Sequence, residues 1–310
     1  MTQARFVHIV DDVPELEGRA DGPVMVTALD GFLDAGSAST LAVGHLLEAS
    51  AGRVVASFEV DEFYDYRARR PPMSFVKDHY SDYEAPRLVV RLLHDDRRAP
   101  YLLLTGPEPD VRWEAFAEGV RAVVEHFDVR LTVAIGSVPM AMPHSRPIQV
   151  TNHATAKRLL VAENVWQGEI RIPSSAQSLL ELRLGEWGHD ATGFVAHIPH
   201  YVAQYPYPEA AAAMLRQVGS VTGLTWETEA LDAAAVARTA EIDAQVAESD
   251  EVRAVVAGLE QQYDAFHRAG PNLLAGDGAP MPDAADLPTG EELGEQFEQF
   301  LAGLDKTEED

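Results

Sequence analysis

The chain has 310 residues, of which 46% are hydrophobic and 24% are charged, a globular composition that excludes a wholly disordered or collagen-like chain. It has no cysteine, which excludes thiolate catalysis, zinc–thiolate sites and disulfides. Its 50 acidic residues against 24 Lys and Arg give a formal net charge of −26, so most of its surface would repel a phosphate backbone and no nucleic-acid partner is expected.

Up to about residue 226, short apolar runs alternate with helical patterns. The runs Val24–Leu29 and Leu131–Ile135 are nearly all apolar, which is typical of strands covered on both faces, and Gly136 is expected to end the second. Further strands are expected at 53–58, 87–93, 101–105, 169–172 and 192–198, and helices at 35–50, 111–127, 154–162, 174–184 and 210–218. Helices of about 10–15 residues between strands indicate parallel pairing, which predicts a three-layer α/β/α sandwich with a mostly parallel sheet.

Beyond residue 226 the pattern is helical and then irregular. An apolar stripe from Leu231 to Phe266 predicts a long helix or helical hairpin over 227–269, with a break near 247–250. Residues 270–288 have the composition of a flexible linker, and 289–305 that of a short amphipathic helix. The predicted organisation is therefore a core domain over 1–226 followed by these three segments.

No segment of the sequence indicates a membrane or an export signal. The longest apolar runs fall far short of the roughly 18 residues of a membrane span, and residues 1–12 lack the pattern of a signal peptide. We therefore expect a cytoplasmic protein that has no membrane partner.

The segment Asp34-Ala35-Gly36-Ser37 joins an expected strand to an expected helix, where backbone amides can bind an anion. It matches neither of the glycine-rich nucleotide-binding loops. A tight turn in which Asp34 or Ser37 caps the helix is the favoured interpretation. An anion-binding role for Asp34, Gly36 and Ser37 is the alternative.

A second segment interleaves arginines with tyrosines and includes Tyr66, Arg67, Arg69 and Arg70. Such side chains can grip an acidic or phosphorylated ligand. Because arginine and tyrosine are both enriched at protein interfaces, a subunit interface is the favoured interpretation.

Polar side chains also follow several expected strand ends. Ligands of open α/β sheets bind at the carboxyl ends of the strands, so these side chains are expected to converge. A carboxylate, an imidazole and an arginine suffice for general acid–base chemistry with anion stabilisation. The candidates are Glu108, His144, Arg146 and His200 for catalysis, and Gly136 and Ser137 for ligand binding.

Neither a metal site nor a cofactor is expected. His197 and His200 are three residues apart, but they flank Pro199 at an expected strand end, where they would not face one metal ion. The sequence has no HExxH or EF-hand pattern and no GxSxG nucleophile elbow.

Five segments, in this order and spacing, resemble the proteasome assembly chaperone family of the second type in its bacterial form. They are Asp34–Gly36, Tyr66–Pro71, Leu103–Pro109, Pro143–Pro147 and Pro199–Tyr201. The resemblance covers roughly residues 5–220. It implies an α/β/α fold similar to purine nucleoside phosphorylases, self-association into a homo-oligomer, and a relation to chaperones that help proteasome α-subunits to assemble.

The C-terminal part of the chain is similar to the family in one respect and differs from it in another. The helical segment after Glu229 is similar to the extension of actinobacterial members. Archaeal and eukaryotic chaperones of this group often dock through a tail that ends hydrophobic–Tyr–any residue, whereas this chain ends Glu308-Glu309-Asp310. Docking by that route is therefore not expected.

Three functions are compatible with these patterns, in the following order. The first is a non-enzymatic oligomeric chaperone or scaffold that acts on proteasome α-subunits or a related assembly. The second is a small-molecule binder or nucleoside-phosphorylase-like enzyme, in which His144 or Glu108 acts as acid or base and Arg146 holds an anion with the Asp34 turn. The third is an ATP-dependent carboxylate–amine ligase, which the scarcity of lysine and the missing phosphate loop argue against.

Overall fold

The computed structural model of the protein describes residues 5–18, 21–31, 33–50, 52–161, 169 and 171–269. The strands are β1 (Val7–Ile9), β2 (Val24–Asp30), β3 (Arg53–Phe58), β4 (Ser74–Val76), β5 (His79–Ser81), β6 (Val89–His94), β7 (Pro100–Pro107), β8 (Leu131–Met140), β9 (Val150–Ala154) and β10 (Ala191–Pro199). The helices are α1 (Ala38–Ala49), α2 (Trp113–His126), α3 (Ala176–Glu186), α4 (Pro208–Thr222), α5 (Glu229–Glu248) and α6 (Asp250–Ala269). Short 3₁₀ turns lie at Ala35–Ser37, Val60–Glu62, Lys157–Leu159 and His200–Val202.

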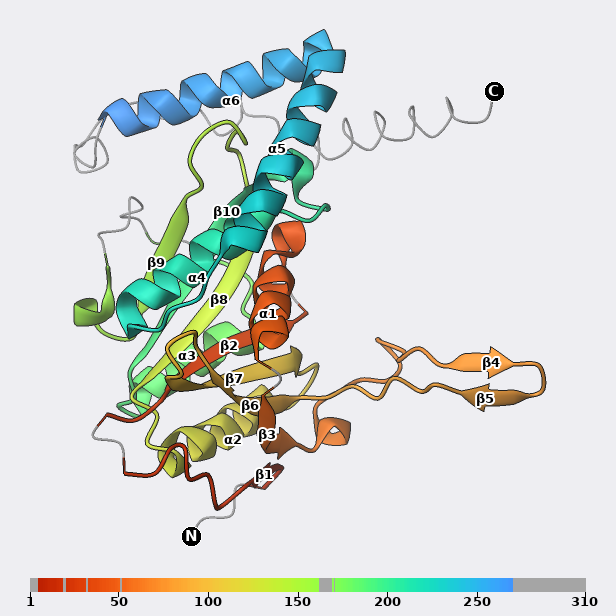
Figure 1. The fold of residues 1–310 in the computed structure, drawn as a ribbon, viewed down its shortest axis with the longest axis vertical. Helices are drawn as coiled ribbons and strands as arrows, with labels where there is room; N and C mark the ends of the chain where they lie inside the picture. The colour runs from red at the N-terminus through yellow and green to blue at the C-terminus, as the bar shows by residue number, and fades with distance from the viewer. Residues whose placement is uncertain are drawn as a thin grey trace. The chain divides into compact units, whose positions relative to one another are not determined.

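Eight strands form one sheet in the order β1-β3-β6-β7-β2-β8-β10-β9 (Figure 1). The four strands β7, β2, β8 and β10 run parallel at its centre. The strands on either side pair antiparallel, and β6 joins β7 through a short turn that only antiparallel neighbours permit. The predicted α/β/α sandwich with its mostly parallel central sheet is confirmed.

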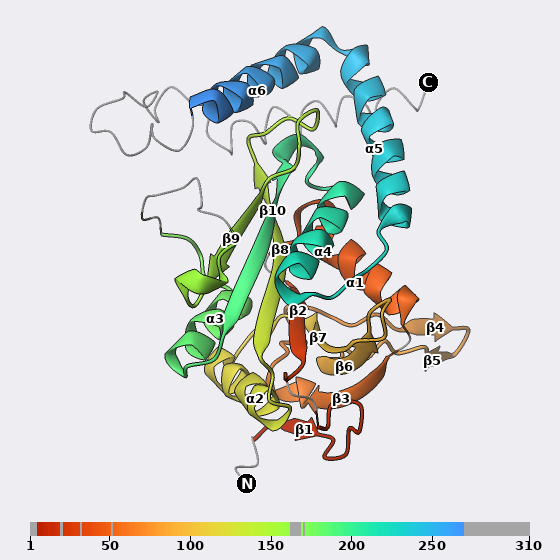
Figure 2. The ribbon, with the colours of Figure 1, turned by 60° about the vertical axis from the view of Figure 1, so that its left-hand side comes forward.

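The central strands contribute to two separate hydrophobic cores. Along β2, Val24 and Val26 face one core and Met25 faces the other. Along β7, Leu103 and Leu102 repeat this alternation, which follows from the two-residue period of a strand. Helices α1 and α4 pack in the first core, and α2 and α3 cover the opposite face (Figure 2). Burial on both faces explains why these strands are apolar throughout.

Helices α5 and α6 form the helical extension. Leu231 and Ile242 of α5 are buried in the first core, so α5 is packed on the sheet-bearing part of the chain. The predicted break is found at Ser249, between the two helices. The described residues up to Glu260 belong to one compact unit, and 261–269 belong to a second. None of the helices in the described part of the chain is long and apolar enough to cross a membrane.

Three local predictions differ from the structure. The helix expected at 154–162 is replaced by the end of β9 and a 3₁₀ turn, and Ala154 and Thr155, at its expected start, are bonded to β10 instead. The strand β8 does not stop at Gly136 but continues to Met140, which pairs with Pro199. The strand expected at 169–172 is not found at its described residues 169, 171 and 172. The linker and helix expected at 270–288 and 289–305 fall outside the described residues.

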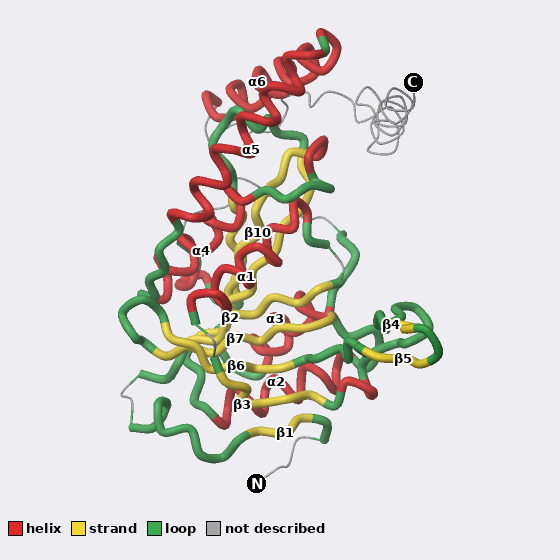
Figure 3. The backbone as a smooth tube through the Cα atoms, turned by 45° about the vertical axis from the view of Figure 1, so that its right-hand side comes forward, coloured by secondary structure: helices red, strands yellow, loops and turns green. Residues whose placement is uncertain are grey.

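The connection between β3 and β6 forms a projecting hairpin that the sequence did not predict. These two strands are antiparallel neighbours, with Ser57 opposite Val89, yet the chain between them makes a long excursion. We call residues 71–86 the arm. It carries β4 and β5, which pair only with each other, and none of its residues is buried. Figures 1 and 3 show the arm extending away from the central sheet.

Candidate functional site

The turn after β2 is closed by the side chain of Asp34. One carboxylate oxygen accepts hydrogen bonds from the amide of Ser39 at 2.7 Å and from the hydroxyl of Ser137 at 3.1 Å. The other accepts from the amide and the hydroxyl of Thr40, at 3.0 and 2.8 Å. The carboxylate thus caps the first turn of α1, where orphan amides and the positive end of the helix dipole favour an anion.

The remaining amides of this turn are also used within the chain. Gly36 donates to the carbonyl oxygen of Ala203 at 2.6 Å, and Ser37 donates to that of Asp34 at 2.9 Å. Gly36 has a φ of +66°, and a Cβ atom there would lie 2.7 Å from the Cβ of Tyr207, so glycine is required for this close approach. A ligand anion would have to displace these contacts, and the ligand role of Asp34, Gly36 and Ser37 stays a prediction.

Ser137, on β8, lies beside this turn. Its hydroxyl is buried and donates to the carbonyl oxygen of Ala35 at 2.8 Å. Gly136 pairs with Val195 inside the sheet. The structure therefore brings the expected ligand-binding residues of β2 and β8 together, and it places them in a hydrogen-bonded strand–helix junction.

Glu108 follows β7 and caps a second helix. One carboxylate oxygen accepts from the amide of Ala176, the first residue of α3, at 2.6 Å. Its carbonyl oxygen accepts from Arg69 at 2.5 Å. Among the hydrogen bonds and ion pairs of the described residues, none joins Glu108 to His144. The two candidate acid–base groups therefore belong to different clusters.

His144 is held between Tyr201 and Asp243, and its side chain is only 2% exposed. Nδ1 lies 2.6 Å from the hydroxyl of Tyr201, and Nε2 lies 3.0 Å from the Asp243 carboxylate. Burial raises the pKa of Tyr201 to about 12, and its hydroxyl also accepts from the backbone amide of His144 at 2.8 Å. The imidazole is thus oriented from both sides.

The next residues of the same loop bind the other helix of the extension. Arg146 pairs with Glu260 of α6 at 3.2 Å, and the hydroxyl of Ser145 donates to the same carboxylate. With the His144–Asp243 contact, the loop after β8 therefore touches both α5 and α6. Sequence reasoning missed Asp243 and Glu260, because acidic residues on a solvated helix carry no signal of a partner about a hundred positions away.

Other titratable groups near this loop are affected by burial. Burial lowers the pKa of His200, whose ring lies 5.4 Å from that of Tyr201. It raises the pKa of Glu209, which accepts a hydrogen bond from the hydroxyl of Tyr207 at 3.2 Å. Clusters of perturbed groups occur at functional sites and in structural networks alike. Within the described residues, no three His, Asp or Glu side chains are arranged to hold a metal ion.

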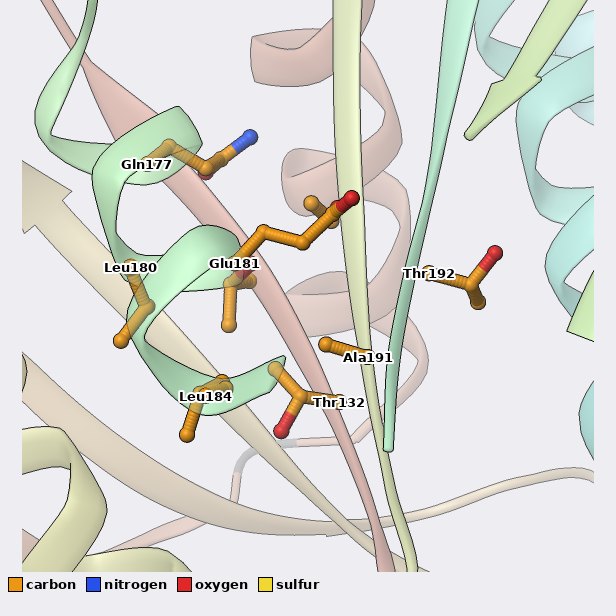
Figure 4. A pocket seen from close by; sticks show the side chains of 9 residues that line it. Thr132, Gln177, Leu180, Glu181, Leu184, Ala191 and Thr192 are labelled. Carbon is orange, nitrogen blue, oxygen red and sulfur yellow. The ribbon is translucent and has the colours of Figure 1, made fainter. Parts of the chain in front are cut away.

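A small cavity lies between α3 and the sheet (Figure 4). Thr27, Thr132, Gln177 and Glu181 are among the residues that line it. Its volume of ≈ 10 Å³ has room for about one water molecule, which excludes it as a substrate pocket. Within the described residues, the buried oxygen atoms of Thr27, Thr132 and Gln177 have no hydrogen-bond partner, and a water in this cavity would supply one.

The arm has a different surface from these loops. Phe75 is 62% exposed and Tyr80 is 72% exposed, and the two rings face each other across the hairpin with centroids 5.1 Å apart. Met73 and Tyr83 add further exposed apolar surface. An isolated two-stranded hairpin is at best marginally stable in water, so such a group of exposed side chains indicates an interaction surface.

The four interface candidates at the base of the arm have different environments. Arg67 and Arg70 are exposed. The hydroxyl of Tyr66 donates to Asp61 at 2.6 Å. Arg69 is directed inward and forms an ion pair with Asp110 at 2.7 Å.

A comparison with protein families matches residues 28–246 to the PAC2 family. The chain belongs to the PAC2 family. The expected resemblance to the second type of proteasome assembly chaperone is thereby confirmed. None of the curated proteins matches this PAC2 chain.

Solved structures similar to this PAC2 protein include three from Mycobacterium tuberculosis and Corynebacterium glutamicum. The Mycobacterium tuberculosis protein of unknown function Rv2714 is 44% identical, with a TM-score of 0.78 over 85% of this chain and 92% of that one. A protein of unknown function from Corynebacterium glutamicum is 34% identical, with a TM-score of 0.80 over 86% and 99%. The Mycobacterium tuberculosis proteasome-assembly chaperone homologue Rv2125 is 28% identical, with a TM-score of 0.67 over 75% and 99%.

Proposed function

We propose that this PAC2 protein is a self-associating, chaperone-like protein of the cytoplasm that acts on proteasome α-subunits or a related assembly, and that the arm is its self-association surface. Membership of the PAC2 family and the similarity to the proteasome-assembly chaperone homologue Rv2125 support the chaperone-like role. The observation that carries the self-association is the exposed aromatic hairpin.

The charge at the base of the arm supports a second copy as the partner. Tyr66–Lys77 contains four basic residues and no acidic one, whereas the rest of the arm holds Asp78, Asp82 and Glu84; the net charge of the chain is −26. Three of these, Arg67, Arg70 and Lys77, are exposed. Opposite charges steer association and set its specificity. A second copy of the chain supplies the acidic surface that this basic segment requires.

An enzymatic role has less support from the geometry. The amides after β2 are already bonded within the chain, and His144 is enclosed by Tyr201 and α5. A substrate at either place would have to displace contacts of the folded protein. The acid–base roles of Glu108, His144, Arg146 and His200 stay predictions.

This proposal is tested by sedimentation and native mass spectrometry. The purified protein is measured alone and after mixing with proteasome α-subunits from the same source. We expect a homo-oligomer that takes up α-subunits. The double variant Phe75→Ser, Tyr80→Ser should be a monomer with an unchanged far-UV spectrum. The control Val236→Ser removes an equally exposed apolar side chain from α5 and should associate as the wild type does.

The two parts of the proposal fail separately. An oligomer that the double variant leaves intact would exclude the arm as the self-association surface. A protein that binds no α-subunit and does not change the rate of their assembly would exclude them as clients, whatever its oligomeric state.

A further inference from the structure

The arm is joined to the core at its two ends. On the outgoing side, Phe63 is buried and its carbonyl oxygen accepts from the amide of Asp110 at 2.8 Å. On the returning side, a Cβ atom on Gly106, whose φ is +137°, would lie 2.1 Å from the carbonyl oxygen of Arg87, so only glycine permits this approach. None of residues 71–86 is buried. The direction of the arm is therefore set at these two ends, and the chain between Phe63 and residue 71 forms the outgoing one.

Arg69 lies in that interval and joins it to the ends of two strands. Its guanidinium donates to the carbonyl oxygen of Glu108, just beyond β7, at 2.5 Å and to that of Asp30, the last residue of β2, at 3.4 Å. It also forms the ion pair with Asp110 at 2.7 Å. The guanidinium carbon lies 4.7 Å from the ring centroid of Tyr64. One side chain thus has four separate contacts.

Asp110 links the same guanidinium to the backbone at the base of the arm. Its second carboxylate oxygen accepts from the amide of Asp65 at 2.7 Å. The carbonyl oxygen of Asp65 accepts in turn from the amides of Ala68 and Arg69, at 3.1 and 3.0 Å. The turn over residues 65–69 is therefore closed on itself and held to the loop after β7.

The chemistry of this position requires arginine. The planar guanidinium offers five donors in a fixed fork and can stack on an aromatic ring, whereas a lysine ammonium is a point charge on a flexible stem. The neighbouring arginines differ. Among the hydrogen bonds and ion pairs of the described residues, none involves the side chain of Arg67 or Arg70.

We propose that Arg69 is a positioning residue that fixes the direction of the arm, and that the arm associates with its partner only when so directed. The sequence pattern groups Arg69 with the interface residues, but its contacts lie inside the subunit. The second half of the proposal rests on the proposed self-association through the arm. The first half does not.

The direction of the arm can be measured by electron spin resonance, because the chain has no native cysteine. Spin labels are placed at Lys77→Cys on the arm and Glu118→Cys on α2, and labelled protein is diluted with unlabelled protein so that only distances within one chain are recorded. We expect a single narrow distance distribution. In Arg69→Gln the distribution should be at least about twofold wider, because the charge-assisted contacts are lost.

Two further variants separate positioning from general damage. Asp110→Asn removes the other partner of the ion pair and should also widen the distance distribution. Arg70→Gln removes an exposed arginine one position away and should leave it narrow. A narrow distribution in Arg69→Gln, or equal widening in Arg70→Gln, overturns the proposal. Arg69→Lys should fail to restore the narrow distribution, and full restoration would overturn the role of the guanidinium fork.

Self-association is measured on the same variants by sedimentation. Arg69→Gln should weaken it by about tenfold or more while the aromatic residues of the arm are unchanged. If Arg69→Gln widens the distribution but associates like the wild type, the second half of the proposal is overturned. If the wild type is a monomer at all concentrations, the proposed self-association fails, and the distance measurement still decides whether Arg69 positions the arm.

Discussion

The turn after β2 and the arm after β3 both belong to connections of one sheet, and the sequence marks functional candidates in the turn itself and at the base of the arm. In the turn, Asp34 and the backbone amides bond to each other and to neighbouring loops. In the arm, β4 and β5 bond to each other and their side chains face outward. The comparison shows that polar residues at a strand end can use their hydrogen-bonding groups to stabilise the fold. The exposed side chains of a hairpin that does not pack on the core are available to a partner.

The largest expected difference between the two regions is in the contribution of an aromatic ring to stability. Phe116 lies on the core face of α2 and is fully buried, so Phe116→Ala should lower the free energy of unfolding by about 4 kcal/mol. Phe75→Ala, on the arm, should change it by less than about 0.5 kcal/mol. Urea unfolding followed by circular dichroism, at a concentration where the protein is monomeric, measures both. A loss above about 2 kcal/mol in Phe75→Ala would show that the arm packs on its own core.

The close approach at Gly36 gives the next largest effect. Gly36→Ala combines a left-handed backbone with a clash against Tyr207 and should cost about 3 kcal/mol. Gly188 has a similar positive φ of +84° with no atom within 4 Å of a Cβ, so Gly188→Ala should cost only about 1 kcal/mol. Thermal or urea unfolding of the pair isolates the clash. Equal losses would mean that Tyr207 moves aside freely.

The cap of α1 should contribute less than the clash. Asp34→Ala leaves the amides of Ser39 and Thr40 without their acceptor and should cost about 2 kcal/mol. Asp78→Ala, at the exposed tip of the arm, should cost less than about 0.5 kcal/mol. The same unfolding assay compares them. An unchanged midpoint in Asp34→Ala would revive the turn as a free anion site.

The smallest effect concerns the pH dependence of stability. Burial raises the pKa of Glu209 above its ordinary value of 4.5, so the folded state favours the protonated carboxyl and its ionisation disfavours folding at neutral pH. Glu209→Gln mimics the protonated form and should raise the unfolding midpoint at pH 7. The gain should shrink as the pH falls through the folded-state pKa and vanish below 4.5, where wild-type Glu209 is protonated in both states. A gain that is constant from pH 4 to 7 would contradict this assignment.

The parts of the fold that the sequence predicts are those where burial leaves a strong pattern. Val24–Leu29 and Leu131–Ile135 are apolar throughout because helices cover both faces of their strands. The segment 154–162 is rich in helix-forming residues, but Ala154 and Thr155 bond to β10, which overrides local propensity at the expected start of the helix. The strands of the arm are three residues long, too short for an alternating pattern to stand out.

The candidate site divides in the same way. The sequence singled out Asp34 and Ser137 separately, and their contact depends on β2 and β8 being parallel neighbours, which the sequence did not predict. The sequence also did not separate Arg69 from Arg70, because the direction of each side chain depends on the turn that Asp110 closes. The partners of His144 and Arg146 on the extension depend on how two helices pack, which no local pattern records.

The connection between β3 and β6 also makes this fold open to engineering. Antiparallel neighbours in a hairpin are usually joined by two to five residues, whereas β3 and β6 are joined through the whole arm. The two limbs of the arm are linked near the base by a hydrogen bond of 3.1 Å from the amide of Glu84 to the carbonyl oxygen of Pro72. The segment between these two residues is thus a module that can be shortened, exchanged or replaced by a foreign binding loop without altering the register of the sheet. Variation in partner choice can accumulate there while the core stays under separate selection for stability.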